Sequence, residues 1–311
     1  MRFLVLGAGA LGGYFGARLL QGGADVTFLV RPRRAGQLAR DGLVVRAQDG
    51  EFRSPVRTVQ QGEAIAPADI VLLTCKAYDL DGAIAAIRPA MGSHSAVFPV
   101  LNGMRHIDVL KEAFGPERVL GGLTTINTAL LPDGVIQQSA LKVNFNAVGE
   151  LDGHKSDRCA AIKQALEKGG LPIDVSDNIV AAMWAKFFGF ASIATIASLT
   201  RSRAGAIARS STGRDFVTAV LDEGARIAAA EGYPSPSNMT DIVHGMFSQA
   251  GSSYGPSILV DMEEGRTTEG EHTIGDMVQR ARKHGIAAPI LTAALCNLQA
   301  YELNRAQPKT S

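Results

Sequence analysis

The first half of the chain alternates short apolar runs with segments of helical spacing. The apolar runs predict strands at residues 3–6, 26–30, 70–74, 96–100 and 118–121. Apolar positions at helical spacing predict intervening helices at residues 11–21, 35–40, 80–90 and 107–114. Strands that alternate with helices in this way predict a parallel sheet covered by helices on both faces.

The pattern then changes along the chain. Residues 43–59 alternate like an antiparallel hairpin, residues 135–149 resemble further strand, and a helix at 157–168 precedes a last strand at 173–175. From Asn178 onward the pattern consists of long helical segments, with Gly- and Pro-rich interruptions at 232–236 and 251–256. We therefore expect an α/β domain over residues 1–176 and a mostly helical domain over residues 177–311.

Composition narrows the possible partners and the compartment. The chain has 311 residues with 31 basic and 30 acidic side chains, so it offers no broad basic surface for nucleic acid or an anionic membrane. No uninterrupted apolar stretch has the length of a membrane helix, and the amino-terminal apolar run has the pattern of a strand rather than a signal peptide. The three cysteines, Cys75, Cys159 and Cys296, predict neither a disulfide framework nor a metal site. We expect a soluble, cytoplasmic protein without nucleic-acid or membrane partners.

A glycine motif lies between the first predicted strand and the first helix, and its sequence is Gly7-Ala8-Gly9-Ala10-Leu11-Gly12. In this position the first glycine permits a tight turn, the second lets the backbone approach a pyrophosphate, and the third lets helix and strand pack closely. The amide groups of the first helical turn then face the anion. The motif predicts dinucleotide binding, and the alternative is a glycine-rich packing turn.

The residues after the second strand indicate which dinucleotide binds. NAD-binding sites usually place Asp or Glu there for the ribose 2′-hydroxyl, whereas this chain has Arg31-Pro32-Arg33-Arg34. A guanidinium binds the oxygens of a 2′-phosphate, which a carboxylate would repel. We predict NADP(H) with Arg31 as its main ligand, while Arg33 or Arg34 individually fits a solvated basic loop.

Two other predicted strands are followed by polar residues. Lys76 comes after the strand that begins at Ile70, and Asn102 comes after the strand that begins at Ala96. An open α/β sheet binds its ligand beyond the carboxyl ends of its strands, so both residues are candidates for cofactor contacts. A surface lysine and an Asn-Gly turn are the alternatives.

Several motifs in order resemble the ketopantoate reductase (2-dehydropantoate 2-reductase) family. They are the glycine motif, Lys76-Ala-Tyr, Asn102-Gly-Met, Trp184-Ala-Lys186, Thr268-Glu269 and the later Lys283-His-Gly-Ile-Ala-Ala-Pro. The resemblance spans nearly the whole chain. It implies an amino-terminal Rossmann-type domain, a helical carboxy-terminal domain, NADPH between them, and reduction of 2-dehydropantoate to pantoate in pantothenate biosynthesis.

The resemblance also implies roles for individual residues. Lys186 becomes the catalytic acid, which suits a reaction in which alkoxide charge develops at a 2-oxo carbon. Glu269 would lie near the cofactor, where it binds ribose hydroxyls or orients the lysine, and Asn102 would contact both nicotinamide and substrate. Ser257 would bind the substrate carboxylate, and the backbone at Ala129 would touch the cofactor.

One departure concerns the substrate. The family pattern has asparagines four and eight residues after the lysine, where this chain has Phe190 and Ala194. Because neither side chain supplies an amide, a pocket built on those hydrogen bonds would lose discrimination. The alternatives to ketopantoate reduction are a paralogue that reduces a bulkier or more apolar keto acid and a non-catalytic NADPH-binding sensor.

Oligomeric state is open at this point. The apolar segment Ile290–Leu298 suits the interface of a homodimer, but a helix buried within its own domain has the same pattern.

Overall fold

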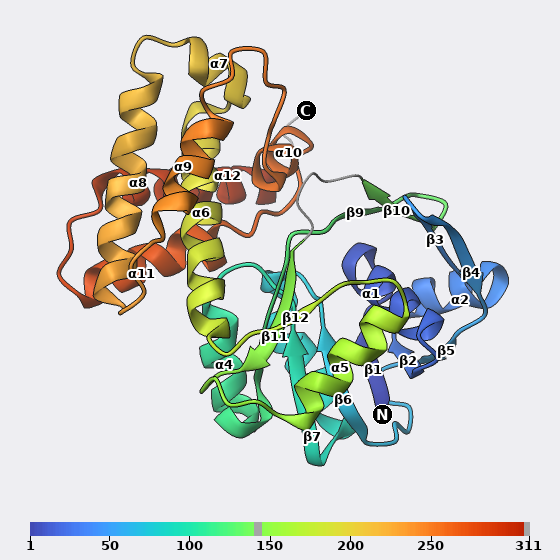
Figure 1. Ribbon diagram of the computed structural model, residues 1–311. Coiled ribbons are helices and arrows are strands. Elements are labelled where there is room, and N and C mark those ends of the chain that lie inside the picture. Colours follow the sequence, from blue (N-terminus) through green and yellow to red (C-terminus); the bar gives the residue numbers. More distant parts are fainter. Residues whose placement is uncertain (140–144, 308–311) are drawn as a thin grey trace. The chain divides into compact units, whose positions relative to one another are not determined.

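The computed structural model describes residues 1–139 and 145–307 (Figure 1). Its contacts divide the chain into an α/β unit of residues 1–101 and 106–180 and a helical unit of residues 102–105 and 181–311. The short segment Asn102–Arg105 therefore belongs with the helices, although the α/β unit flanks it in the sequence. This division places Asn102 in the same unit as Lys186.

The α/β unit is built on a five-stranded sheet with the order β5-β2-β1-β6-β7, and every pairing in it is parallel. Its strands are β1 (Arg2–Leu6), β2 (Asp25–Leu29), β5 (Arg57–Val59), β6 (Ala68–Leu73) and β7 (Met91–Pro99). Val5, Phe28 and Leu72 are buried within it, as expected for strands covered on both faces. The predicted α/β fold with a parallel sheet is confirmed.

Helices and short turns lie between the strands of this unit. They are α1 (Ala10–Gln21), α2 (Pro32–Asp41), α3 (Leu80–Ile87), α4 (Arg105–Phe114) and α5 (Asp157–Lys168), with the short turns η1 (Ala77–Asp79), η2 (Arg88–Ala90) and η3 (Pro116–Arg118). Helix α1 packs closely because its glycines leave room for neighbours. A Cβ atom at Gly13 would collide with Ile136, and one at Gly16 would collide with the Phe28 ring.

Two smaller sheets complete this unit. One has the order β4-β3-β10-β9 and the other β12-β11-β8. Their strands are β3 (Leu43–Ala47), β4 (Gly50–Ser54), β8 (Leu120–Thr124), β9 (Asn127–Leu130), β10 (Ile136–Ser139), β11 (Asn146–Glu150) and β12 (Asp174–Val175).

Two expectations about strands were wrong in detail. The hairpin predicted over 43–59 ends at Ser54, and residues 57–59 instead join the parallel sheet beside β2; Pro55, which has no N–H for a ladder, separates the two. The strand predicted at 118–121 lies at Leu120–Thr124 and pairs antiparallel with β11. The segment predicted over 135–149 contains β10 and the start of β11, and its residues 140–144 lie outside the described part of the chain.

The second unit is helical, as predicted. Its helices are α6 (Ile179–Thr200), α7 (Ala204–Arg209), α8 (Gly213–Ala230), α9 (Ser237–Met246), α10 (Ser257–Glu263), α11 (Asp276–Lys283) and α12 (Pro289–Ala306), with a π-helical turn η4 (Glu271–Gly275). In Figure 1 α6, α8 and α9 run beside one another. Close approaches of Gly224 to Phe188 and of Gly189 to Met239 agree with this arrangement.

Helix α6 is apolar on all sides. It has 22 residues, and within the described residues it is the one helix long and apolar enough to cross a membrane by length and composition. Two thirds of its most apolar window is buried inside the protein, which is typical of a core helix. Lys186 is its single charged residue.

The apolar residues of α12 are used within the helical unit. Leu291, Ala294 and Leu298 are buried, and a Cβ atom at Gly270 would press on Leu298. The Glu223 carboxylate accepts hydrogen bonds from the backbone N–H groups of Ile290 and Leu291 at the start of the helix. This packing explains the apolar segment without a second chain, and a homodimer stays a prediction.

Candidate active site

The glycine loop has the geometry that a dinucleotide phosphate requires. Gly7 has a φ of 85° and its N–H donates to the Leu29 carbonyl at 2.8 Å. A Cβ atom at Gly7 or Gly9 would meet nothing within 4 Å, so the space beside this backbone is open. A Cβ atom at Gly12 would instead collide with the Gly7 carbonyl and the Thr74 hydroxyl.

Helix α1 begins at Ala10, and its first turn contains no acidic side chain. Its amide groups and the positive end of its dipole are therefore available to an anion. Ala8 is buried, while Ala10 and Leu11 are half-buried. The loop Gly7–Gly12 thus fits a pyrophosphate.

Arg31 and Arg34, both in the basic segment after β2, have different surroundings. The Arg31 side chain is 83% exposed and its guanidinium pairs with Asp79 at 3.0 Å. Arg34 is half-buried, and it donates from Nε to the Ala8 carbonyl at 2.8 Å and from Nη1 to the Gly134 carbonyl at 3.0 Å. Arg31 is therefore free to move toward a ligand, whereas Arg34 is fastened to the glycine loop.

Lys76 and Ala129 are both exposed. Lys76 directly precedes η1, and its carbonyl accepts the N–H of Asp79, the residue that pairs with Arg31. This arrangement brings the segments after β2 and β6 together. Ala129 lies on β9 opposite Gln137 of β10. Their cofactor contacts stay predictions.

In the helical unit, Lys186 and Asn102 are directly joined although they are far apart in sequence. Lys186 Nζ donates to Asn102 Oδ1 at 3.2 Å. The Glu269 carboxylate lies close enough to stabilise the ammonium group and raise its pKa. Three of the residues predicted for the site thus form one cluster.

Burial changes the acidity of this lysine. Removal of the ammonium from water lowers the pKa of Lys186 to about 8, and the nearby Glu269 carboxylate opposes that shift. A proton donor is most effective when its pKa lies near the working pH. The surroundings of Lys186 therefore suit proton transfer at neutral pH.

Aromatic packing fixes the segment of α6 that carries the lysine. Trp184 stacks on Tyr233 with ring centroids 5.7 Å apart, and the Arg280 guanidinium lies 5.0 Å from the Trp184 ring centre. Arg280 is itself bound by Glu231 at 2.6 Å and by Asp276 at 3.1 Å. The tryptophan of the Trp-Ala-Lys motif thereby anchors α6 two residues before Lys186.

His272 is a residue of this region that the sequence analysis missed. It lies in the π-helical turn that begins two residues after Glu269, and it is 8% exposed. Burial lowers its pKa and Arg105 adds to that effect, while the Glu269 carboxylate opposes it. A histidine three residues after the family glutamate was the available sequence signal.

The predicted substrate residues have different surroundings. Ser257 is the exposed first residue of α10, and Phe190 is half-buried one helical turn after Lys186. Ala194 is 0% exposed. Substrate contacts of all three stay predictions, and Ala194 has no surface to offer a ligand in this structure.

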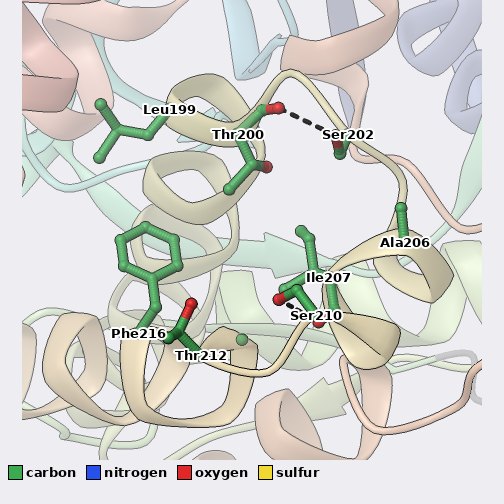
Figure 2. A pocket seen from close by; sticks show the side chains of 9 residues that line it. Leu199, Thr200, Ser202, Ala206, Ile207, Ser210, Thr212 and Phe216 are labelled. Atoms are coloured by element: carbon green, nitrogen blue, oxygen red, sulfur yellow. Dashed lines mark hydrogen bonds between the residues drawn. The ribbon is translucent and has the colours of Figure 1, made fainter.

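A hollow of about 450 Å³ lies between the end of α6, α7 and the start of α8, and Figure 2 shows the side chains that line it. Its lining includes the apolar residues Leu199, Ile207 and Phe216 and the hydroxyl groups of Thr200, Ser202, Ser210 and Thr212. The Ser202 and Ser210 hydroxyls donate to backbone carbonyls within their own turns. The lining has no charged side chain for a keto-acid carboxylate, and it contains none of the predicted site residues.

The α/β unit carries a glycine loop of the kind that binds a dinucleotide pyrophosphate, and a helical unit follows it. The family model described as ketopantoate reductase PanE/ApbA matches residues 3–152, and the model of its C-terminal region matches residues 178–302. The chain belongs to the ketopantoate reductase family. It is therefore an oxidoreductase from a family that acts on small molecules.

Individual relatives cover the same length. The "Uncharacterized oxidoreductase YkpB" of Bacillus subtilis is 34% identical over 305 residues, which are 98% of this chain and 100% of that protein. The structure of 2-dehydropantoate 2-reductase from Methylococcus capsulatus has a TM-score of 0.88 at 24% identity, over 99% of both chains. The structure of D-mandelate dehydrogenase with NADH and anilino(oxo)acetate has a TM-score of 0.85 at 23% identity, over 99% of this chain and 100% of that one. At such identities these structures support the fold.

Proposed function

We propose that this protein reduces a 2-oxo acid to a 2-hydroxy acid with NADPH. The observation that carries the proposal is the half-buried Lys186, which donates to Asn102, lies near Glu269 and has a pKa of about 8. A group of that acidity is protonated at neutral pH and still releases its proton readily.

Each group of site residues has its own expected role in this reaction. The Gly7–Gly12 loop would hold the pyrophosphate, and Arg31 would bind the 2′-phosphate that distinguishes NADPH from NADH. A bound nicotinamide supplies the hydride. The Lys186 ammonium attracts the anionic substrate, stabilises the developing alkoxide and gives it a proton. Asn102 and Glu269 hold that ammonium, and Ser257 would bind the substrate carboxylate.

The family relationship favours 2-dehydropantoate as the substrate, with pantoate as the product for pantothenate biosynthesis. A second candidate is a larger or more apolar 2-oxo acid. Phe190 favours it, because a phenyl ring stands one turn after Lys186 where the family pattern has an amide. The D-mandelate dehydrogenase neighbour was solved with anilino(oxo)acetate, an oxo acid with an aromatic group.

Oxidation of NADPH with a panel of 2-oxo acids tests the proposal. The panel should contain ketopantoate, straight-chain and branched 2-oxo acids, and aryl 2-oxo acids. NADH should be run in parallel, since the D-mandelate dehydrogenase structure holds NADH. Tight NADPH binding without turnover of any compound would instead support the alternative of a non-catalytic NADPH-binding sensor.

A further inference from the structure

His272 lies near Glu269 and beside the residue that follows Asn102. Its neighbour in space is Gly103, where an added Cβ atom would lie 3.1 Å from the His272 carbonyl oxygen and 3.3 Å from Cδ2 of the imidazole. Gly103 has a φ of 87°, a conformation that favours glycine. The turn of Asn102 and Gly103 therefore lies beside the backbone carbonyl and ring edge of His272, with little room for a Cβ atom at position 103.

The π-helical turn Glu271–Gly275 positions the His272 imidazole beside Gly103. The Glu269 carbonyl accepts both the N–H of Thr273 at 3.1 Å and the Thr273 hydroxyl at 2.9 Å. Gly270 allows α12 to pack closely, because a Cβ atom there would press on Leu298. A π-helical turn is a local departure that occurs frequently at functional sites. Here the turn carries His272 and begins two residues after Glu269.

We propose that His272 is a positioning residue: its buried imidazole edge supports the Asn102–Gly103 turn and so keeps Asn102 Oδ1 where it accepts the hydrogen bond of Lys186. The inference rests on the proposed function, because it gives His272 a part in the same proton donation. His272 acts through Asn102 and needs no contact with substrate.

The charged groups around the ring agree with this role. Glu269 precedes it on the same segment, and Arg105 faces it from the start of α4. On the α12 side, the Gln299 amide is held by Glu271. Burial lowers the pKa of His272 and so favours the neutral imidazole, while the Glu269 carboxylate acts electrostatically on both His272 and the Lys186 ammonium.

The test measures the pKa of Lys186 in the ligand-free protein by competitive labelling with acetic anhydride and mass spectrometry. Asn102→Ala should lower it by about one unit, because the ammonium loses an acceptor. His272→Ala should reproduce most of that shift, and the double variant should add little, since both changes remove the same support. His272→Phe keeps a ring edge against Gly103 and should stay near the wild type.

Near-UV circular dichroism and thermal unfolding establish that each variant is folded, and His244→Ala on α9 is the matched histidine control. The proposal is overturned if folded His272→Ala leaves the pKa of Lys186 unchanged, if the two shifts add fully, or if His272→Phe is as damaging as His272→Ala. With an active substrate, kcat should fall about tenfold in His272→Ala while NADPH binding stays unchanged. Should the wild type reduce no 2-oxo acid, the proposed function fails, yet the labelling experiment still decides the role of His272.

Discussion

Two cations of the candidate site, Arg31 and Lys186, differ in what surrounds their charges. After β2, the Arg31 side chain is mostly exposed and paired with Asp79. On α6, Lys186 stands alone as a charge in an apolar helix, joined to Asn102 and near Glu269. An exposed guanidinium stays charged at any accessible pH and suits phosphate binding, whereas a half-buried amine with a pKa of about 8 can exchange its proton.

The largest expected effect tests the buried side of this comparison. Lys186→Ala should lower kcat about 10²- to 10⁴-fold, the usual cost of losing a general acid. NADPH binding should change little, because the glycine loop and Arg31 are untouched. Steady-state kinetics and fluorescence titration measure the two quantities. Normal turnover would mean that another acid performs the chemistry, and loss of NADPH binding in a folded variant would make Lys186 a cofactor ligand.

The next effect concerns the pocket beside this lysine. Although the family relationship favours ketopantoate, we expect the wild type to reduce it poorly unless other amides compensate for Phe190 and Ala194. Each missing hydrogen bond costs about 1–3 kcal/mol, and two together reach a few hundredfold or more in kcat/KM if they add. The double variant Phe190→Asn with Ala194→Asn should raise kcat/KM for ketopantoate relative to that for aryl 2-oxo acids.

Because Ala194 is fully buried, an asparagine there needs new space and new partners. Phe190→Asn alone is therefore the second variant, and it should shift the preference in the same direction. Efficient ketopantoate turnover by wild type, undiminished relative to these variants, would show that other residues build the pocket.

Titration of Lys186 provides a third test. The proton donor must be charged, so kcat/KM should be constant below pH 8 and fall as pH rises through the pKa of about 8. The fall should be about tenfold per pH unit above it. Lys186→Arg is the control, because its guanidinium does not deprotonate in this range and should abolish the alkaline limb while lowering the rate. An alkaline limb that persists in Lys186→Arg would belong to another group.

For the exposed cation of the comparison, Arg31→Ala should weaken NADPH binding about ten- to hundredfold and leave NADH binding nearly unchanged. The loss of a charged hydrogen bond is worth about 1.5–3 kcal/mol. Fluorescence titration of both cofactors measures this, with Arg33→Ala as the neighbouring control. Equal binding of the two cofactors by wild type would remove the basis for NADP specificity.

The sequence predicted the parallel sheet well because its strands are buried on both faces and leave continuous apolar runs. It predicted the pairing of the shorter strands less well. Residues 57–59 carry no pattern that distinguishes a hairpin edge from the edge of the parallel sheet, and in the structure they form β5, which pairs with β2. Such pairing depends on neighbours that are distant in sequence.

For the candidate site, local motifs singled out Gly7–Gly12 and Asn102, which follow predicted strands, and the family resemblance singled out Lys186. Their roles stay predictions. The sequence was silent on His272, since its position depends on a π-helical turn and on contact with Gly103, which is 169 residues earlier in the numbering. The sequence also left Arg34 as a candidate for a solvated basic loop, whereas the structure half-buries its side chain against the carbonyls of Ala8 and Gly134. Such burial depends on residues that are distant in sequence.

The difference between Arg31 and Arg34 leads to the prediction with the smallest expected effect. Arg34 donates to the carbonyls of Ala8 and Gly134, and burial lowers its pKa, so we expect it to hold the glycine loop in shape rather than to recognise the 2′-phosphate. Arg34→Lys keeps the charge but loses the forked geometry. A hydrogen bond makes a net contribution of about 0.5–1.5 kcal/mol, so the binding of NADPH and of NADH should each weaken about two- to tenfold. Equal weakening in a titration of both cofactors would separate this role from that of Arg31. A loss confined to NADPH would mean that Arg34 also binds the 2′-phosphate, and the contrast between the two arginines would disappear.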